Sequence, residues 1–315
     1  MESQQDERKD VKSKGSDFNG AGKSGDTIFT WDFSSRALAL LATVTAAASV
    51  TDNSLWITAV IAFGLSHYLL SFYYAAPQIK FLVTSPAHQL SGVTLLVAGS
   101  VLYLTKFPLA IFFALHHAFN EGYLRRSTAP SEGSVTESVG AARALLHGLG
   151  FMVVIRHEAA LRNIPEMLLW LGLAIAAAFY WRAIRNNRSI SHTSATSFSS
   201  PEVLLGLVIL LSLQMEISWL QVVFYHFALW AIHPIAGLSK QGSAALTEYL
   251  ALTIGSLIGF FVMATTKLAG DFLDMAFWYG QFLFCSYIHI ATSLALSKAH
   301  PTWIVRLFQP QAEAR

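Results

Sequence analysis

Charged residues are scarce in this 315-residue chain, making up 13% of the sequence against about 25% in an average soluble domain. The net charge of +2 excludes a large nucleic-acid-binding surface. Cysteine is almost absent, because Cys285 is the single one, so neither an intramolecular disulfide nor a cysteine-ligated cluster can form within one chain. What remains is a chain that is 54% hydrophobic, with a mean hydropathy of +0.47, and is far too apolar for water.

The hydrophobic residues come in long blocks. Blocks of roughly 17–25 apolar residues cross a bilayer as helices, and lipid permits only helices or closed barrels. These blocks are too long and continuous for barrel strands, so the sequence predicts an all-α fold, a polytopic transmembrane helical bundle with eight to ten spans. The expected spans are 34–50, 54–76, 89–105, 107–124, 139–155, 164–181, 202–217, 219–237, 246–266 and 273–296. The seventh and eighth share one run that only "QMEIS" (214–218) interrupts, so they form either a tight hairpin or one long helix.

Three regions are expected along the chain. Residues 1–30 read as a disordered polar tail, because they mix both charge signs with Gly and Ser and lack the apolar stretch of a secretory signal. Residues 31–298 form the transmembrane domain, with a polar linker at 185–200, and residues 299–315 form a C-terminal tail. On a ten-span model the basic residues concentrate in loops on the side of the N-terminus, which predicts a multi-pass protein of the cell inner membrane with a cytoplasmic N-terminus.

Histidines inside the expected spans are the strongest chemical signal. Neutral imidazole is the commonest protein metal ligand, and iron, copper and zinc all accept it. The ten-span model places four histidine-bearing spans in the same direction, so their rings could meet at one depth, and the lack of cysteine favours iron over a structural zinc. The primary ligand candidates are His67, His117, His226 and His289. The secondary candidates are His116 and His233.

Glu121 adds a carboxylate to this set. It follows His117 by four residues, so both lie on one helical face. We interpret Glu121 as a candidate catalytic residue, either a metal ligand or the acceptor that fixes an imidazole tautomer. The alternative places it at the inner membrane interface beside Arg125 and Arg126. Each single histidine also has an alternative as a hydrogen-bonding residue between helices, although ionisable residues within spans are functional hypotheses by default.

Four short segments carry a resemblance to a known family. They are "GLSHYLLSFYY" (64–74), "ALHHAFNEGY" (114–123), "FYHFALWAIHP" (224–234) and "YIHIATSLAL" (287–296). The chain resembles the Brp/Blh family of membrane β-carotene dioxygenases, whose first Gly-x-Pro-His-Gly motif would place His67 as a ligand and whose His-Phe-Gly-Glu/Asp segment would match His117 and Glu121. Ser66 and Tyr68 stand where that first motif has Pro and Gly.

The resemblance implies a non-haem iron, Fe(2+), that uses dioxygen to cleave β-carotene or another hydrophobic polyene lipid into retinal-like products. Two alternatives stay open. Haem A synthases also place single histidines on four transmembrane helices, so a bis-histidine haem protein with a redox function is the first. The second is a non-enzymatic transporter or assembly protein in which the histidines pack or relay protons. No nucleic acid is expected as a partner.

Overall fold

The computed structural model describes residues 31–50, 52–84, 86–128, 137–187, 200–266 and 275–296. Within these ranges the chain is helical and contains no strand, which confirms the all-α class. The elements are α1 (Trp31–Ser49), α2 (Asn53–Thr84), α3 (Pro86–Leu104), α4 (Leu109–Thr128), α5 (Glu137–Val154), η1 (Ala159–Leu161), α6 (Glu166–Asn187), α7 (Ser200–Ser212), α8 (Trp219–Ile232), α9 (Ile235–Gln241), α10 (Ser243–Thr266) and α11 (Met275–Leu296). The predicted tails at 1–30 and 299–315, and most of the linker at 185–200, lie outside the described residues.

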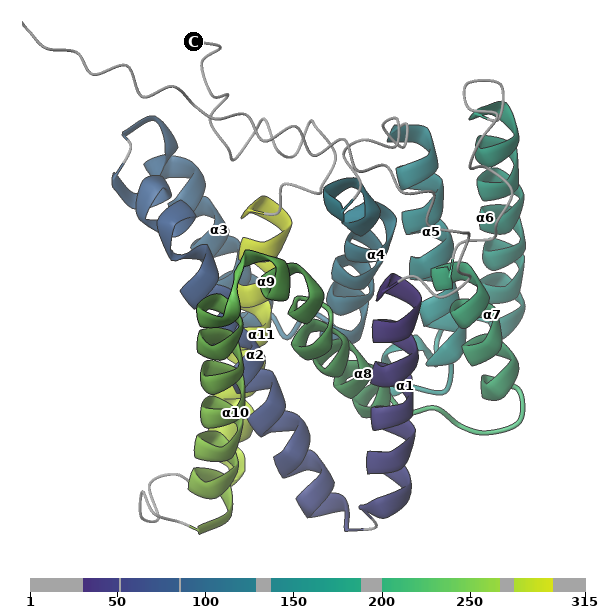
Figure 1. Ribbon diagram of the computed structural model, residues 1–315. Helices are drawn as coiled ribbons and strands as arrows, with labels where there is room; N and C mark the ends of the chain where they lie inside the picture. Colours follow the sequence, from purple (N-terminus) through teal and green to yellow (C-terminus); the bar gives the residue numbers. More distant parts are fainter. Residues whose placement is uncertain are drawn as a thin grey trace, which may run out of the picture.

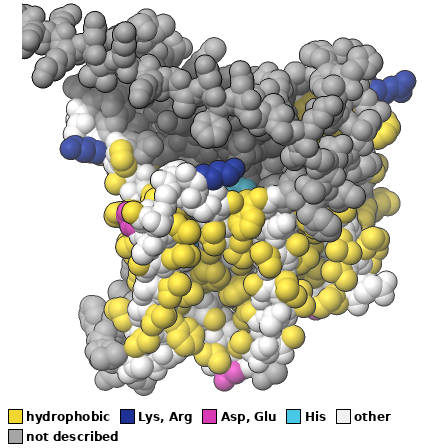
Figure 2. Space-filling view, viewed as in Figure 1, with side chains coloured by type: hydrophobic (Ala, Val, Ile, Leu, Met, Phe, Trp, Pro, Cys, Tyr) yellow, Lys and Arg dark blue, Asp and Glu magenta, His cyan; other side chains and the backbone are white. Residues whose placement is uncertain are grey.

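Four helical segments are long and apolar enough to cross a membrane. They are Asn53–Pro77, Glu166–Asn186, Trp219–Gln241 and Ser243–Thr266. Large hydrophobic side chains cover most of the described surface in Figure 2, and the Lys and Arg side chains in view lie towards its upper edge. Such a surface is unfavourable in water, which fits a protein whose outer face meets lipid.

The long run from 201 to 238 folds as two helices and not as one long helix. α7 ends at Ser212 and α8 begins at Trp219, after a capping box in which the Ser218 hydroxyl accepts from the Gln221 N–H and the Gln221 side chain accepts from the Ser218 N–H. Arg156 closes the end of α7 by donating to the Ser212 carbonyl at 2.8 Å. The polar "QMEIS" segment therefore ends one helix and prepares the next.

Four helices surround the core. α2 packs against α3, α8, α10 and α11, and α4 packs against α5 and α11. Figure 1 shows α2, α4, α8 and α11 running from the lower to the upper part of the view, the common direction that the sequence predicted for the histidine-bearing segments. Their facing sides, together with Phe151 of α5, form a core rich in aromatic rings, which includes Phe113, Phe227, Phe282 and Tyr287.

Gly64 sets the closest approach within this core. A Cβ atom at this position would lie 2.5 Å from Phe282 Cε2 and 2.9 Å from Phe227 Cε2, so only glycine fits without displacement of the rings. α2 therefore passes directly against α8 and α11 one turn before His67.

Candidate metal centre

Three of the predicted ligand histidines lie together. His67 on α2, His226 on α8 and His289 on α11 each offer a nitrogen, and these nitrogens all lie within 4.8 Å of one another. His67 Nε2 is 3.3 Å from His289 Nε2. The His226 and His289 side chains are buried and His67 is partly buried. We call these residues the histidine triad; they come from positions 67, 226 and 289, so tertiary packing alone unites them.

The closest pair of the triad has the spacing of two ligands on one metal ion. A transition metal binds imidazole nitrogens at about 2.0–2.1 Å, so two nitrogens on one ion lie about 3.0–3.4 Å apart. The 3.3 Å between His67 and His289 falls in this interval. A direct hydrogen bond would also account for that pair, but it leaves unexplained the third imidazole, whose ring centroid lies 5.5 Å from that of His67.

The adjacent histidines of α4 face different sites. The His116 ring centroid lies 5.2 Å from that of His226 and 5.4 Å from that of His289, so His116 borders the triad. Asn120 donates from Nδ2 to His116 Nε2 at 3.1 Å and fixes that ring. The primary candidate His117 instead lies 6.3 Å from both the His147 and the His226 centroids, between the triad and a second group of polar residues.

Aromatic side chains enclose the triad. The His67 ring lies 5.3 Å from the Phe227 ring, and the Tyr68 ring 5.0 Å from that of His289. Phe113 of α4 lies 4.9 Å from His226. These rings cover much of the triad with apolar surface, and no Asp, Glu or Cys joins the group of close ligand atoms among the described residues.

Glu121 does not belong to the histidine triad and pairs instead with an arginine of α1. Its carboxylate accepts from Arg36 Nη1 of α1 at 2.5 Å, and both side chains are only 3% exposed. The candidate catalytic residue is thus held by a buried ion pair. The alternative partners Arg125 and Arg126 have side chains outside the described part of the chain.

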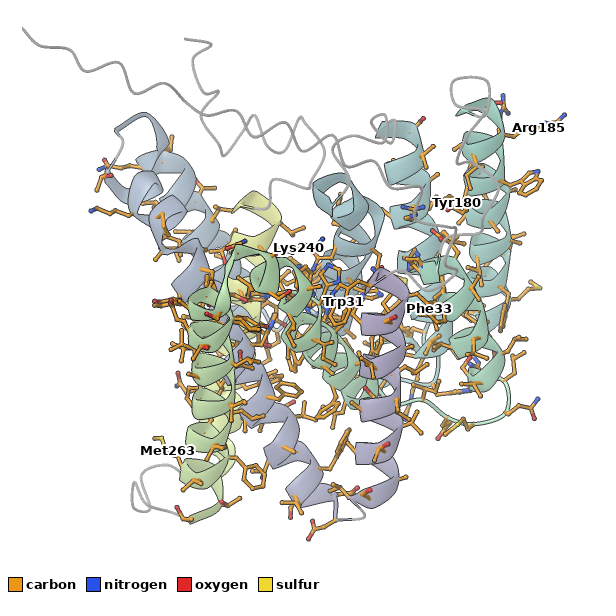
Figure 3. All side chains as sticks on the ribbon, viewed as in Figure 1. Trp31, Phe33, Tyr180, Arg185, Lys240 and Met263 are labelled. Carbon is orange, nitrogen blue, oxygen red and sulfur yellow. The ribbon has the colours of Figure 1, made fainter. Side chains whose placement is uncertain are left out.

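A second buried ion pair lies close to the first. Arg143 of α5 donates from Nε to Glu202 of α7 at 2.6 Å and from Nη2 to the Tyr180 hydroxyl of α6 at 3.1 Å; Figure 3 labels Tyr180 on the side of α6 that faces α5. His147 Nε2 lies 3.8 Å from Glu202 Oε1. We define the polar cluster as the two ion pairs with the histidines between them, namely Arg36, Glu121, His117, His147, Arg143 and Glu202.

The secondary candidate His233 lies outside the triad. It ends α8, where its carbonyl accepts from Trp31 Nε1 at 2.9 Å and its Nδ1 lies 3.2 Å from the Ser35 hydroxyl. Trp31 is labelled at the upper end of α1 in Figure 3. His233 therefore joins α1 to α8, and its position seven residues after His226 gives it a related helical face without a place at the same centre.

Two cavities flank these groups. The larger, of about 420 Å³, lies between α1, α4, α5, α7 and α8 and reaches His117, Glu121 and His147. The smaller, of about 140 Å³, is lined by His67 together with Tyr74, Trp230 and Tyr249. The triad thus has a small opening beside His67, and the polar cluster borders a larger apolar space.

Sequence reasoning missed Arg36, Arg143 and Glu202 as parts of a buried site. A signal existed for Arg36, because it is the single charged residue within the expected span 34–50. Glu202 and Arg143 stand near the ends of expected spans, where a charge is ordinary. Their burial follows from the packing of α5 against α7, and this packing cannot be predicted from the local sequence.

No family model, curated protein or solved structure matches this chain. The geometry of the described residues is therefore the basis for assigning a function.

Proposed function

We propose that this protein is a multi-pass integral membrane protein whose histidine triad holds a non-haem iron ion and oxidises a polyene lipid with dioxygen. The observation that carries the proposal is the convergence of three imidazoles from separate helices within 4.8 Å. Ionisable residues inside membrane-spanning helices are rare and mark functional sites. Three from distant parts of the chain at ligand spacing are better explained by a shared ion than by packing.

The donor set can accommodate iron. Imidazole suits iron, copper and zinc, whereas structural zinc sites commonly include cysteine. Three nitrogens from His67, His226 and His289, with His116 beside them, leave coordination positions open. When bound there, iron would supply the activation of dioxygen. Of the protein's own residues, Asn120 orients the neighbouring His116, and Phe113 and Phe227 cover the triad with apolar rings.

The spacing of the His67–His289 pair favours non-haem iron over a haem held by these two residues. Two axial imidazole nitrogens on opposite sides of one iron lie about 4 Å apart. The His67 and His289 nitrogens are 3.3 Å apart, and the His67 and His226 rings meet edge to face at 5.5 Å. The Tyr68 ring packs against His289 and the Phe227 ring against His67.

A polyene lipid is the substrate class that suits these surroundings. The small cavity beside His67 is lined by Phe227, Trp230 and Tyr74. Flat aromatic walls suit a flat conjugated chain. We place the protein in the cell inner membrane with its N-terminus in the cytoplasm, because of the loop charges.

The test is metal analysis of the purified full-length protein, followed by coexpression in carotenoid-producing cells. We expect iron at about one ion per chain in the wild type and a loss of at least about tenfold in the His67→Ala, His226→Ala and His289→Ala variants. His157→Ala, at an exposed loop position, is the matched control. Coexpression should consume pigment and form a cleaved or oxidised product only with the intact triad. Wild-type protein that is free of iron and leaves the pigment unchanged would refute the proposal.

A further inference from the structure

A hydrogen bond between two buried hydroxyl groups lies directly beside the triad. Tyr68 of α2 and Ser286 of α11 approach each other with 2.7 Å between their hydroxyl oxygens, and both residues are buried. Tyr68 follows His67 directly in the sequence, and Ser286 precedes His289 by three residues, which places these two on neighbouring turns of the same face of α11. The bond therefore joins the two helices at the level of the His67–His289 pair.

A second hydrogen bond fixes the direction of the first. The Ser286 hydroxyl donates its single hydrogen to the Phe282 carbonyl of the preceding turn at 2.6 Å. The Ser286 oxygen can then only accept from the Tyr68 hydroxyl, so the tyrosine is the donor. Through this relay the Tyr68 side chain is tied to the backbone of α11.

The aromatic ring of Tyr68 contacts the triad itself. Its centroid lies 5.0 Å from that of His289, with 35° between the two planes, and 5.8 Å from that of His67. The Tyr68 ring also lies 5.9 Å from that of Phe282, the residue that comes closest to Gly64 one turn earlier on α2. Tyr68 is thus held at both its ring and its hydroxyl, and it acts as a spacer between α2 and α11.

We infer that Tyr68 is a positioning residue of the triad. Its hydrogen bond to Ser286 holds α2 and α11 at the separation that places His67 Nε2 3.3 Å from His289 Nε2, and its ring restricts the His289 imidazole. Residues that hold ligands in place raise metal affinity, because the ion then binds without a rearrangement of the rings. The inference rests on the proposed metal site, and it assigns the ligand spacing there to a side chain that does not bind the ion.

The experiment is a titration of the metal-free full-length protein in phosphatidylcholine nanodiscs with Co²⁺, followed by the visible absorption of the bound ion. The absorption that disappears in His289→Ala reports on the triad. Tyr68→Phe removes the hydroxyl and keeps the ring, and Ser286→Ala removes the acceptor. Each should weaken Co²⁺ binding about tenfold and change the visible spectrum, which depends on the ligand geometry. Because both variants delete the same bond, the double variant should bind no more weakly than either single one.

Ser66→Ala is the matched control on the same helix. The Ser66 hydroxyl is buried and lies 2.6 Å from that of Ser256 on α10, so this variant also loses a buried hydrogen bond of α2, but one to a different helix. It should lower the unfolding temperature about as much as Tyr68→Phe does, and it should keep the wild-type Co²⁺ affinity and spectrum.

The outcomes separate this inference from the metal site. A wild-type protein that binds no Co²⁺ would refute the metal site and the inference together. A wild-type protein that binds Co²⁺, with a Tyr68→Phe variant of the same affinity and spectrum, would overturn the inference alone. An equal loss of affinity in Ser66→Ala, or losses that add in the double variant, would also overturn it.

Discussion

The histidine triad and the polar cluster are both buried, but they differ in charge: the triad consists of imidazoles alone, and the polar cluster contains paired ions. The triad gathers three imidazoles without a described carboxylate among its ligand atoms. The polar cluster holds two arginine–glutamate pairs with side chains no more than 5% exposed. An uncharged imidazole costs less to bury than an ion and leaves ligand atoms available, whereas buried ions require their partners. The first arrangement suits binding an ion, and the second suits holding helices together.

The comparison predicts different failures in the two regions. Loss of a triad ring should remove metal and leave the bundle intact, because the ring is replaced by a small apolar side chain. Loss of one ion in the polar cluster should damage the bundle itself, because an arginine is then buried without its counter-charge.

Glu121→Ala should have the largest effect on stability. It leaves the Arg36 guanidinium, 3% exposed, without its carboxylate, and removal of one partner of a buried pair costs about 3–5 kcal/mol. Thermal unfolding of the purified protein, followed by intrinsic fluorescence, measures the loss. Glu216→Ala, at an exposed position, is the control. The double replacement Arg36→Met with Glu121→Leu should recover most of the stability; a double variant as unstable as the single one would contradict this reading.

The adjacent histidines of α4 give the next largest contrast. His116→Ala should weaken iron binding about 10–100-fold, as removal of groups that support a metal site does, because His116 packs on His226 and His289. His117→Ala should leave the iron affinity nearly unchanged, because His117 lines the larger cavity and not the triad. Metal analysis after graded chelation compares the two variants. If both variants lost iron equally, the triad and the polar cluster would have to be treated as one site, which would contradict this prediction.

Gly64→Ala should disturb the triad through packing. The new Cβ would lie 2.5 Å from Phe282 and 2.9 Å from Phe227, and overpacking of this kind costs about 1–3 kcal/mol. Iron content should fall with stability, since α2 carries His67 one turn further on. Gly255→Ala on α10, where a Cβ meets nothing within 4 Å, should be neutral or slightly stabilising. The measurements are the unfolding temperature and the iron content of the two variants. A Gly64→Ala variant with wild-type stability and iron content would contradict the close approach of α2 to α8 and α11.

Asp52→Ala should have the smallest effect, at the start of α2. The Asp52 carboxylate accepts from the Ser54 hydroxyl at 2.6 Å and from the Ser54 N–H at 2.7 Å, and these hydrogen bonds lower the pKa of Asp52. A lowered folded-state pKa adds stability at neutral pH that is lost as the pH falls through that pKa. The difference in unfolding temperature between wild type and variant should therefore shrink from neutral pH to about pH 3. A difference that is constant with pH would contradict this cap.

The positions of the helices could be predicted from the sequence, because the length of an apolar block is a local property. Each expected span corresponds to a helix in the structure, including the break at "QMEIS". His67, His226 and His289 were also identified from their depth within these blocks. The choice between His116 and His117 was not readable, because neighbours on a helix point about 100° apart and only the surrounding helices decide which ring faces which site.

The pairing of Glu121 with Arg36 was likewise beyond local pattern. The two residues are 85 positions apart, and Glu121 stands four residues after His117, which suggested a link within α4. The actual partner comes from α1, brought close because α1 packs against α7 and α8. A charge in an apolar block indicates that a partner exists; it does not say on which helix.

The adjacency of His116 and His117 ties the two buried regions to a single backbone. A turn of α4 about its own axis cannot move one imidazole and leave the other in place. A rotation of α4 that shifts His117 beside the larger cavity would therefore also shift His116 beside the triad.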